Sequence, residues 1–127
     1  MKFRAPGNGV EFEIPDEWWT FSDMPEFRPG RFYPYPQSYV EVTEVVPLRE
    51  IEPPIRDAHV PSFRKYKLVP VLLAFTSPEC SLPPVQAIAI ASGGNYKYRV
   101  TNGYHRYYAS VAAGFEFLPI TEKEHAI

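Results

Sequence analysis

The sequence lacks the features that identify a disulfide-rich, metal-binding or membrane protein. Its single cysteine, Cys80, excludes a disulfide within the chain, and no Cys and His residues stand at the spacing of a metal site. No apolar run approaches the roughly 18 residues that span a bilayer, and the first residues lack the apolar segment of a secretion signal. We therefore expect a cytoplasmic protein with no bound metal and no membrane contact.

An excess of charge of one sign is also missing. Thirteen Lys and Arg against fifteen Asp and Glu give a formal net charge of -2, so the chain as a whole does not favour nucleic acid as a partner. A site for an anion would have to be local. The 127 residues, 45% of them hydrophobic, are enough to build one packed core.

Proline and aromatic residues, in contrast, are plentiful in the first part of the chain. The fifteen prolines are concentrated between Pro6 and Pro84, a pattern that disfavours long helices. We interpret residues 1–39 as an N-terminal arm with a short strand, followed by a domain over residues 40–127. The arm covers its own core or mediates contact with a protein partner or a second subunit. Its aromatic residues include Trp18, Trp19, Phe21, Phe32, Tyr33 and Tyr35.

The apolar pattern predicts short strands and turns in the first half. Residues 10–14 and 39–46 alternate apolar and polar side chains with period two, as half-buried strands do. Asp16 is placed to cap a single helical turn that ends at Trp19. Residues 47–67 contain four prolines and predict a loop with at most one helical turn.

The second half predicts a small mixed sheet with short helices, an α+β fold. The expected elements are a helix over 69–76 with Pro70 in its first turn, a central strand over 85–91, a turn at 93–95, a strand over 96–100, a helix over 104–113 that ends at Gly114, and a strand over 115–120. Strands 85–91 and 96–100 are expected to form a hairpin.

The segment NGYHR, residues 102–106, begins the second predicted helix. Asn102 is a favourable N-cap, so the amides of the next three residues have no acceptor within the helix. These donors and the helix dipole favour an anion, and Gly103 lets it approach closely. His105 and Arg106 add side-chain donors. The pattern predicts a site for a phosphate-sized anion, while a solvated His-Arg pair is an equal alternative on spacing alone.

Two segments, LPPVQAIAI (82–90) and GGNYKYRVTNGYHRYYASVAAG (93–114), resemble the core of the sulfiredoxins and of the wider ParB/sulfiredoxin superfamily. In that superfamily a Pro-Pro strand and a second strand lead into a Gly-x-His-Arg box, which a helix and a strand follow. The resemblance covers about residues 43–121 and implies a ParB/sulfiredoxin-like domain.

The resemblance also implies a nucleotide site for ATP or another nucleotide, with or without Mg²⁺. The residues matched to it are Lys67, Asn102, Gly103, Tyr104, His105 and Arg106. Lys67 is matched by counting back without a gap from the Pro-Pro pair. Two hydroxyl residues expected near it are replaced by Pro70 and Ala74, so this second contact agrees only in part.

The catalytic position of the sulfiredoxins is not matched. Tyr104 stands where those enzymes carry the attacking cysteine, so we do not expect sulfinic acid reduction. Asn102 replaces an aspartate found in the serine kinases of the same superfamily. The candidates for a catalytic role are Glu44 and His105, but ordinary burial preferences favour a solvated side chain over a catalytic base for Glu44, as for Glu50.

Three functions stay open at this point. The first is a nucleotide-dependent enzyme, either a phosphotransferase or a nucleotide hydrolase. The second is a non-catalytic protein-protein interaction module with a degenerate phosphate site. The third, a DNA-associated or nuclease-like ParB-type protein, is less favoured because only TEKEHAI follows Ile120 and no pair of carboxylates is suited to two metal ions.

Overall fold

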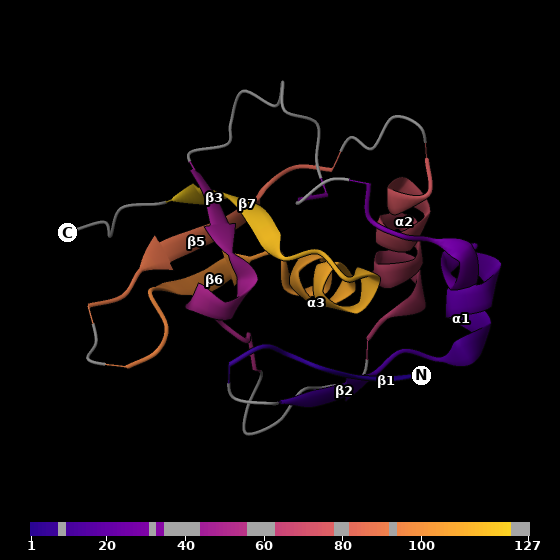
Figure 1. Ribbon diagram of the computed structural model, residues 1–127, viewed down its shortest axis with the longest axis horizontal. Helices are drawn as coiled ribbons and strands as arrows, with labels where there is room; N and C mark the ends of the chain where they lie inside the picture. The colour runs from indigo at the N-terminus through magenta and orange to yellow at the C-terminus, as the bar shows by residue number, and fades with distance from the viewer. Residues whose placement is uncertain are drawn as a thin grey trace.

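The computed structural model describes residues 1–7, 10–30, 33–34, 44–55, 63–77, 82–91 and 94–122. These residues form a five-stranded mixed sheet, a separate pair of strands and three α-helices (Figure 1). The prediction of an α+β fold with a small mixed sheet and short helices is confirmed.

The five-stranded sheet has the strand order β3-β7-β5-β6-β4. Its strands are β3 (Glu44–Pro47), β4 (Ile51–Glu52), β5 (Val85–Ala89), β6 (Tyr98–Asn102) and β7 (Phe117–Glu122). As expected, β5 is central: it runs antiparallel to β6 and parallel to β7. Its largely apolar sequence suits this place because Val85 and Ala87 are fully buried.

The sheet is curled, and one short segment joins its two edges. The turn Leu48–Glu50 leads directly from β3 at one edge to β4 at the other. One hydrogen bond ties this turn to the residue before β6: the amide of Lys97 donates to the carbonyl of Glu50 at 2.8 Å. A second joins β6 to β3: the hydroxyl of Tyr98 donates to the carboxylate of Glu44 at 3.1 Å.

The helices lie to one side of the sheet in the view of Figure 1, with α3 between the sheet and α2. They are α1 (Asp16–Phe21), α2 (Lys65–Phe75) and α3 (Tyr104–Ala113), and a short 3₁₀ helix follows α1 at Met24–Glu26. α3 buries Tyr107, Tyr108 and Ala109 completely. None of the helices in the described part of the chain has the length and apolar character needed to cross a membrane.

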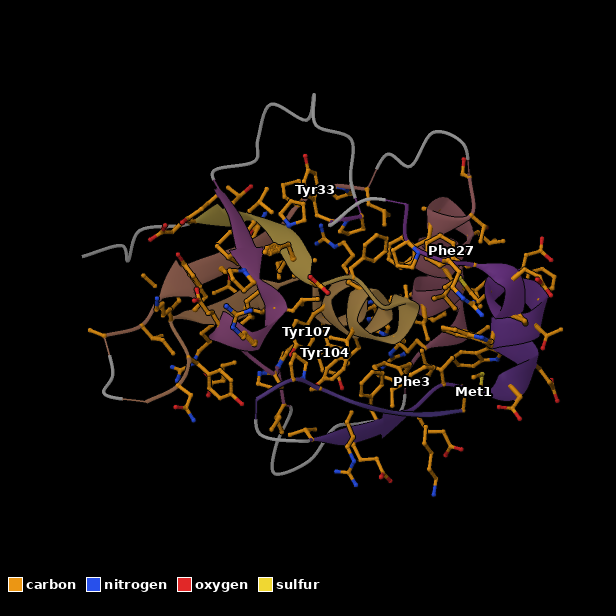
Figure 2. All side chains as sticks on the ribbon, in the orientation of Figure 1. Met1, Phe3, Phe27, Tyr33, Tyr104 and Tyr107 are labelled. Carbon is orange, nitrogen blue, oxygen red and sulfur yellow. The ribbon has the colours of Figure 1, made fainter. Side chains whose placement is uncertain are left out.

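The N-terminal residues contribute to the same core. β1 (Lys2–Arg4) and β2 (Glu11–Glu13) form an antiparallel pair in which Phe3 lies opposite Phe12. The ring of Phe12 packs edge-on against Tyr108 of α3, with ring centroids 4.8 Å apart. Figure 2 shows the side chain of Phe3 directed inward from this strand pair. β1 and β2 therefore pack against α3. Phe32 and Tyr35 lie outside the described residues.

The predictions about the starts of α1 and α2 were wrong. α2 begins at Lys65, so Pro70 lies in the interior of the helix and cannot donate a backbone hydrogen bond to the carbonyl four residues earlier. Asp16 is the first residue of α1 rather than its cap, and the cap is Pro15. The carboxylate of Asp16 instead accepts a hydrogen bond from the N-terminal amine at 2.6 Å.

The predicted strands all have counterparts, with shifted ends. The first, over 10–14, corresponds to β2, and 85–91 to β5. The strand predicted over 39–46 is described from Glu44, and it includes Pro47 because an edge strand tolerates a residue that cannot donate. Its residues 39–43 lie outside the described residues. The last two strands, predicted over 96–100 and 115–120, both begin and end two residues later.

Candidate functional site

α3 follows β6 with a single residue between them. Asn102 is the last residue of β6 and pairs with Gln86 of β5, so the prediction that Asn102 caps the helix was wrong. Pairing with β5 keeps Asn102 extended, and Gly103 is the N-cap. The first helical positions are therefore Tyr104, His105 and Arg106, so the predicted span 104–113 is confirmed although the cap lies one residue after Asn102.

Gly103 turns the chain from strand to helix in a conformation that other residues rarely adopt. Its φ is 126° and its ψ is 28°. A Cβ atom at this position would lie 3.0 Å from both γ-methyl groups of Val85. The amide of Tyr107 donates to the carbonyl of Gly103 at 2.8 Å, which closes the first turn. Backbone conformation and packing against β5 thus both require glycine here.

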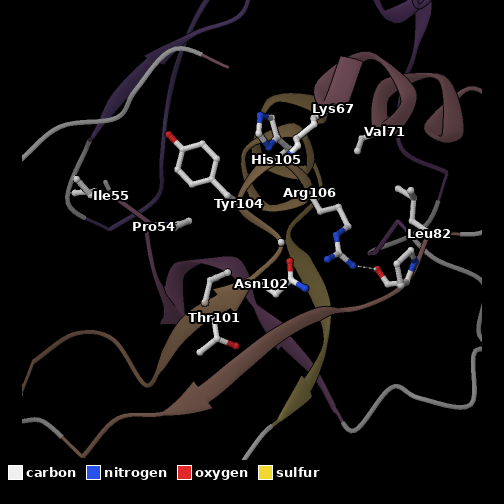
Figure 3. Close-up of a pocket in the computed structure, with 13 residues that line it drawn as sticks. Pro54, Ile55, Lys67, Val71, Leu82, Thr101, Asn102, Tyr104, His105 and Arg106 are labelled. Atoms are coloured by element: carbon white, nitrogen blue, oxygen red, sulfur yellow. Dashed lines mark hydrogen bonds between the residues drawn. The ribbon is translucent and has the colours of Figure 1, made fainter. Parts of the chain in front are cut away.

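An open pocket of about 520 Å³ lies at this junction (Figure 3). It is lined by all six residues matched to the nucleotide site in the sequence: Lys67, Asn102, Gly103, Tyr104, His105 and Arg106. Lys67 comes from the first turn of α2, whereas the other five form the β6–α3 junction. The fold therefore brings together residues that are distant in the sequence.

The pocket concentrates positive charge. Its described lining contains the cationic side chains of Lys67 and Arg106 but no acidic side chain. The N-terminal end of α3 also faces it and contributes the positive end of the helix dipole. In a chain with a net charge of -2, this arrangement is a local site at which an anion is stabilised.

Arg106 is held in place by the segment that precedes β5. Its Nη1 donates to the carbonyls of Pro83 and Pro84, both at 2.8 Å (Figure 3 draws the bond to Pro83). A guanidinium has five N–H donors, so Nε and Nη2 remain for a ligand. No carboxylate in the described part of the chain pairs with Arg106. The arginine is thus fixed in position and keeps part of its donor capacity.

His105 makes a contact that the sequence gave no reason to expect. Its ring is buried, with an exposed fraction of 9%, and packs edge-on against Phe63 at 5.7 Å between ring centroids. Its Nε2 accepts a hydrogen bond from the backbone amide of Arg64 at 3.3 Å. Arg64 is the N-cap of α2, so this contact joins the starts of the two helices that line the pocket.

Tyr104, at the position of the sulfiredoxin cysteine, is part of the core. Its ring is buried and packs against Phe63 at 5.8 Å and Tyr108 at 5.1 Å. Figure 3 shows the ring pointing from α3 toward the side of the pocket formed by Pro54 and Ile55. Tyr104 therefore lines the pocket mainly as an aromatic wall.

The two catalytic candidates, Glu44 and His105, do not both line the pocket. Glu44 lies in β3 and is not among the described residues that line the pocket; it accepts the hydrogen bond from Tyr98. Burial and this bond raise the pKa of Tyr98 to about 12.

Glu50, the other glutamate considered as a source of a carboxylate, forms an ion pair with Lys97 at 3.5 Å. No cluster of His, Cys, Asp and Glu suited to a metal ion occurs in the described residues, which exclude Cys80.

A second open pocket, of about 500 Å³, lies beside the β5–β6 pair. Its charged lining residues are Glu52 and Arg99, which form an ion pair at 2.7 Å. Because the two charges compensate each other, this pocket lacks the positive charge of the first one.

Part of the first pocket could not be found from local sequence. An apolar part of the pocket wall is formed by Pro54, Ile55 and Leu82. Pro54 and Ile55 reach it because β4, which ends two residues before Pro54, pairs with β6. That pairing joins segments distant in the sequence, and the proline-rich segment 47–67 carried no signal for it.

Comparisons of the chain with protein-family models, with curated proteins and with solved structures find no match. The resemblance to the ParB/sulfiredoxin superfamily therefore stays a prediction from the sequence.

Proposed function

We propose that the pocket binds the phosphate groups of a nucleotide such as ATP, and that the chain is a nucleotide-phosphate-binding protein of the ParB/sulfiredoxin type in the cytoplasm. The observation that carries this proposal is the convergence of Lys67 and Arg106, from separate helices, beside the N-terminus of α3. Phosphate oxygens are stabilised by a helix N-terminus and by charge-assisted hydrogen bonds of this kind.

Each part of the pocket has a distinct task in this proposal. Arg106 offers its remaining guanidinium donors to two phosphate oxygens, and Lys67 adds a mobile point charge. The apolar side chains of Ile55, Val71 and Leu82 give surface for the rest of the nucleotide. Mg²⁺ would enter with the phosphates, since the described lining has no carboxylate to hold it.

Phosphoryl transfer or nucleotide hydrolysis is the reaction class that such a site supports. Arg106 would stabilise the charge that develops on the transferred phosphoryl group. Tyr104 is buried and Glu44 lies outside the described lining, so binding is the stronger part of the proposal.

A non-catalytic interaction module with the same phosphate site is the second candidate. Two observations favour it. The side chain at the nucleophile's position, Tyr104, is packed in the core. Phe21 of α1 and Tyr66 of α2 have exposed fractions of 66% and 67%, which leaves aromatic surface for a protein partner or for self-association.

Calorimetric titration with ATP, ADP, CTP and GTP, with and without Mg²⁺, tests the proposal. We expect binding that Lys67→Ala weakens about tenfold or more, because a charged hydrogen bond contributes about 1.5–3 kcal/mol. Lys65→Ala is the matched control: Lys65 is exposed on the same helix and does not line the pocket.

Absence of binding at millimolar nucleotide would refute the proposal. Arg106→Ala should also weaken binding, but it removes the bonds to Pro83 and Pro84 as well, so Lys67 gives the cleaner result. If nucleotide binds, a phosphate-release assay then separates an enzyme from a binding module.

A further inference from the structure

The contact between His105 and Arg64 determines which nitrogen of the histidine ring carries the hydrogen. Nε2 accepts the hydrogen bond from the Arg64 amide at 3.3 Å. A histidine nitrogen that accepts carries no proton, so the neutral ring has its hydrogen on Nδ1. The packed rings of Phe63 and Tyr104, at centroid distances of 5.7 and 5.4 Å, keep the imidazole in this orientation.

Arg64 in turn controls the start of α2. Its carbonyl accepts from the amides of Lys67 at 3.0 Å and Leu68 at 2.9 Å, which closes the first helical turn. The amide of an N-cap residue has no acceptor inside its own helix, so His105 supplies one from another element. The hydrogen bond therefore joins the turn that carries Lys67 to the turn that carries Arg106.

We infer that His105 is a positioning residue, which fixes α2 so that Lys67 meets the phosphate bound at the start of α3. This inference rests on the proposed function and assigns His105 a different role from the direct phosphate contact that the family resemblance implies. The structure supports it because Nε2 faces the backbone of Arg64, while Lys67 and Arg106 line the pocket from the two joined helices.

Nucleotide affinity of His105 variants tests the inference. His105→Leu removes the acceptor and should weaken ATP binding about fivefold to tenfold, the effect of one hydrogen bond. His105→Gln can place its amide oxygen near the position of Nε2, so it should stay within about twofold of wild type.

A double-mutant cycle separates positioning from direct contact. If His105 acts through Lys67, His105→Leu should have little further effect once Lys67→Ala is present, whereas two independent phosphate contacts would give additive losses. Additive losses, or wild-type affinity in His105→Leu, would overturn the inference and leave the proposed function intact. A wild-type protein that binds no nucleotide would refute both.

The tautomer gives a readout that needs no nucleotide. In ¹⁵N spectra of the imidazole, assigned by comparison with His105→Gln, Nδ1 should have the shift of a protonated nitrogen and Nε2 that of an acceptor. The opposite tautomer would contradict the inference directly, because a protonated Nε2 cannot accept from Arg64.

Discussion

Two residues of the pocket hold the fold and face the proposed ligand at the same time. Arg106 donates to two backbone carbonyls through Nη1 and keeps its other donors. Gly103 forms the junction between β6 and α3 and lines the pocket. Substitutions at these positions therefore change stability as well as binding, and they need controls of similar chemistry elsewhere in the chain.

Gly103→Ala is expected to destabilise the protein by about 2–6 kcal/mol. The alanine would have to adopt a φ of 126° with its Cβ 3.0 Å from Val85, and strained backbone and overpacking each cost about 1–3 kcal/mol. Urea denaturation measures the loss. Gly30→Ala is the control, since no atom lies within 4 Å of an added Cβ there; equal effects of the two substitutions would contradict this account.

The sequence predicted the importance of Gly103 for a different reason. A Gly before a helix that carries His and Arg indicated close approach of an anion, but the packing of Gly103 against Val85 depends on the β5–β6 pairing. Because Asn102 still pairs with β5, the N-cap of α3 is Gly103 and not Asn102. The residue type identifies Asn102 as a favourable N-cap, but the local sequence does not determine at which residue the preceding strand ends.

At the scale of elements, the link between β6 and β3 closes the curled sheet. The hydroxyl of Tyr98 bonds to Glu44 across 54 positions of the sequence, and the negative charges of Glu44, Glu122 and Glu50 all favour the protonated phenol. Glu44 therefore stabilises the contact between β3 and β6.

Stability should therefore fall as the pH rises above about 10. Tyr98 has a pKa of about 12 in the folded chain against an ordinary value of 10.0, so the unfolded chain loses this proton first. The contribution of the Tyr98 hydroxyl to the free energy of unfolding is complete below about pH 10 and is lost as the pH rises through about 12. Burial raises the pKa of Tyr107 and Tyr108 as well, so they add to the same loss.

Urea midpoints measured from pH 8 to pH 12 for wild type and Tyr98→Phe test this point. The variant lacks the titrating hydroxyl, so its midpoint should fall less steeply between about pH 10 and pH 12. Parallel curves for the two proteins would show that Tyr98 does not contribute.

The spacing of apolar residues predicted the order of the main elements, because the side chains that each element buries recur at the period of a strand or a helix. β5, β6, α3 and β7 all follow in the expected order, and Gly114 ends α3 in the left-handed conformation, as expected. The start of α2 was missed because Pro70 suggested a first turn. The helix tolerates Pro70 in its interior because it buries many apolar side chains: Leu68, Val69, Val71, Leu72 and Phe75.

For the whole molecule, the N-terminal residues are expected to be necessary for stability. Phe12 has an exposed fraction of 4% and packs on Phe63 and Tyr108, so Phe12→Ala should cost about 3–5 kcal/mol. Phe21→Ala, at an exposed fraction of 66%, should change stability by about 0.5 kcal/mol or less. Thermal denaturation compares the two, and equal stabilities would mean that residues 1–30 are not needed by the core.

The positive pocket is a property of the folded molecule that composition could not predict. The net charge of -2 indicates no preference for an anion, and Lys67 by itself is one lysine among many charged residues. Only the packing of α2 against α3 places it beside Arg106. The resemblance pointed to these residues, and the geometry supplies the physical reason why they can act together.

The central claim, that a nucleotide phosphate binds at the start of α3, is tested most directly by a ¹H–¹⁵N NMR titration with ATP. We predict that the largest shifts fall on the backbone amides of Lys67, Gly103 and Arg106, while those of Glu52 and Arg99 beside the second pocket stay nearly constant. No shift at millimolar ATP, or shifts centred on Glu52 and Arg99, would contradict the claim.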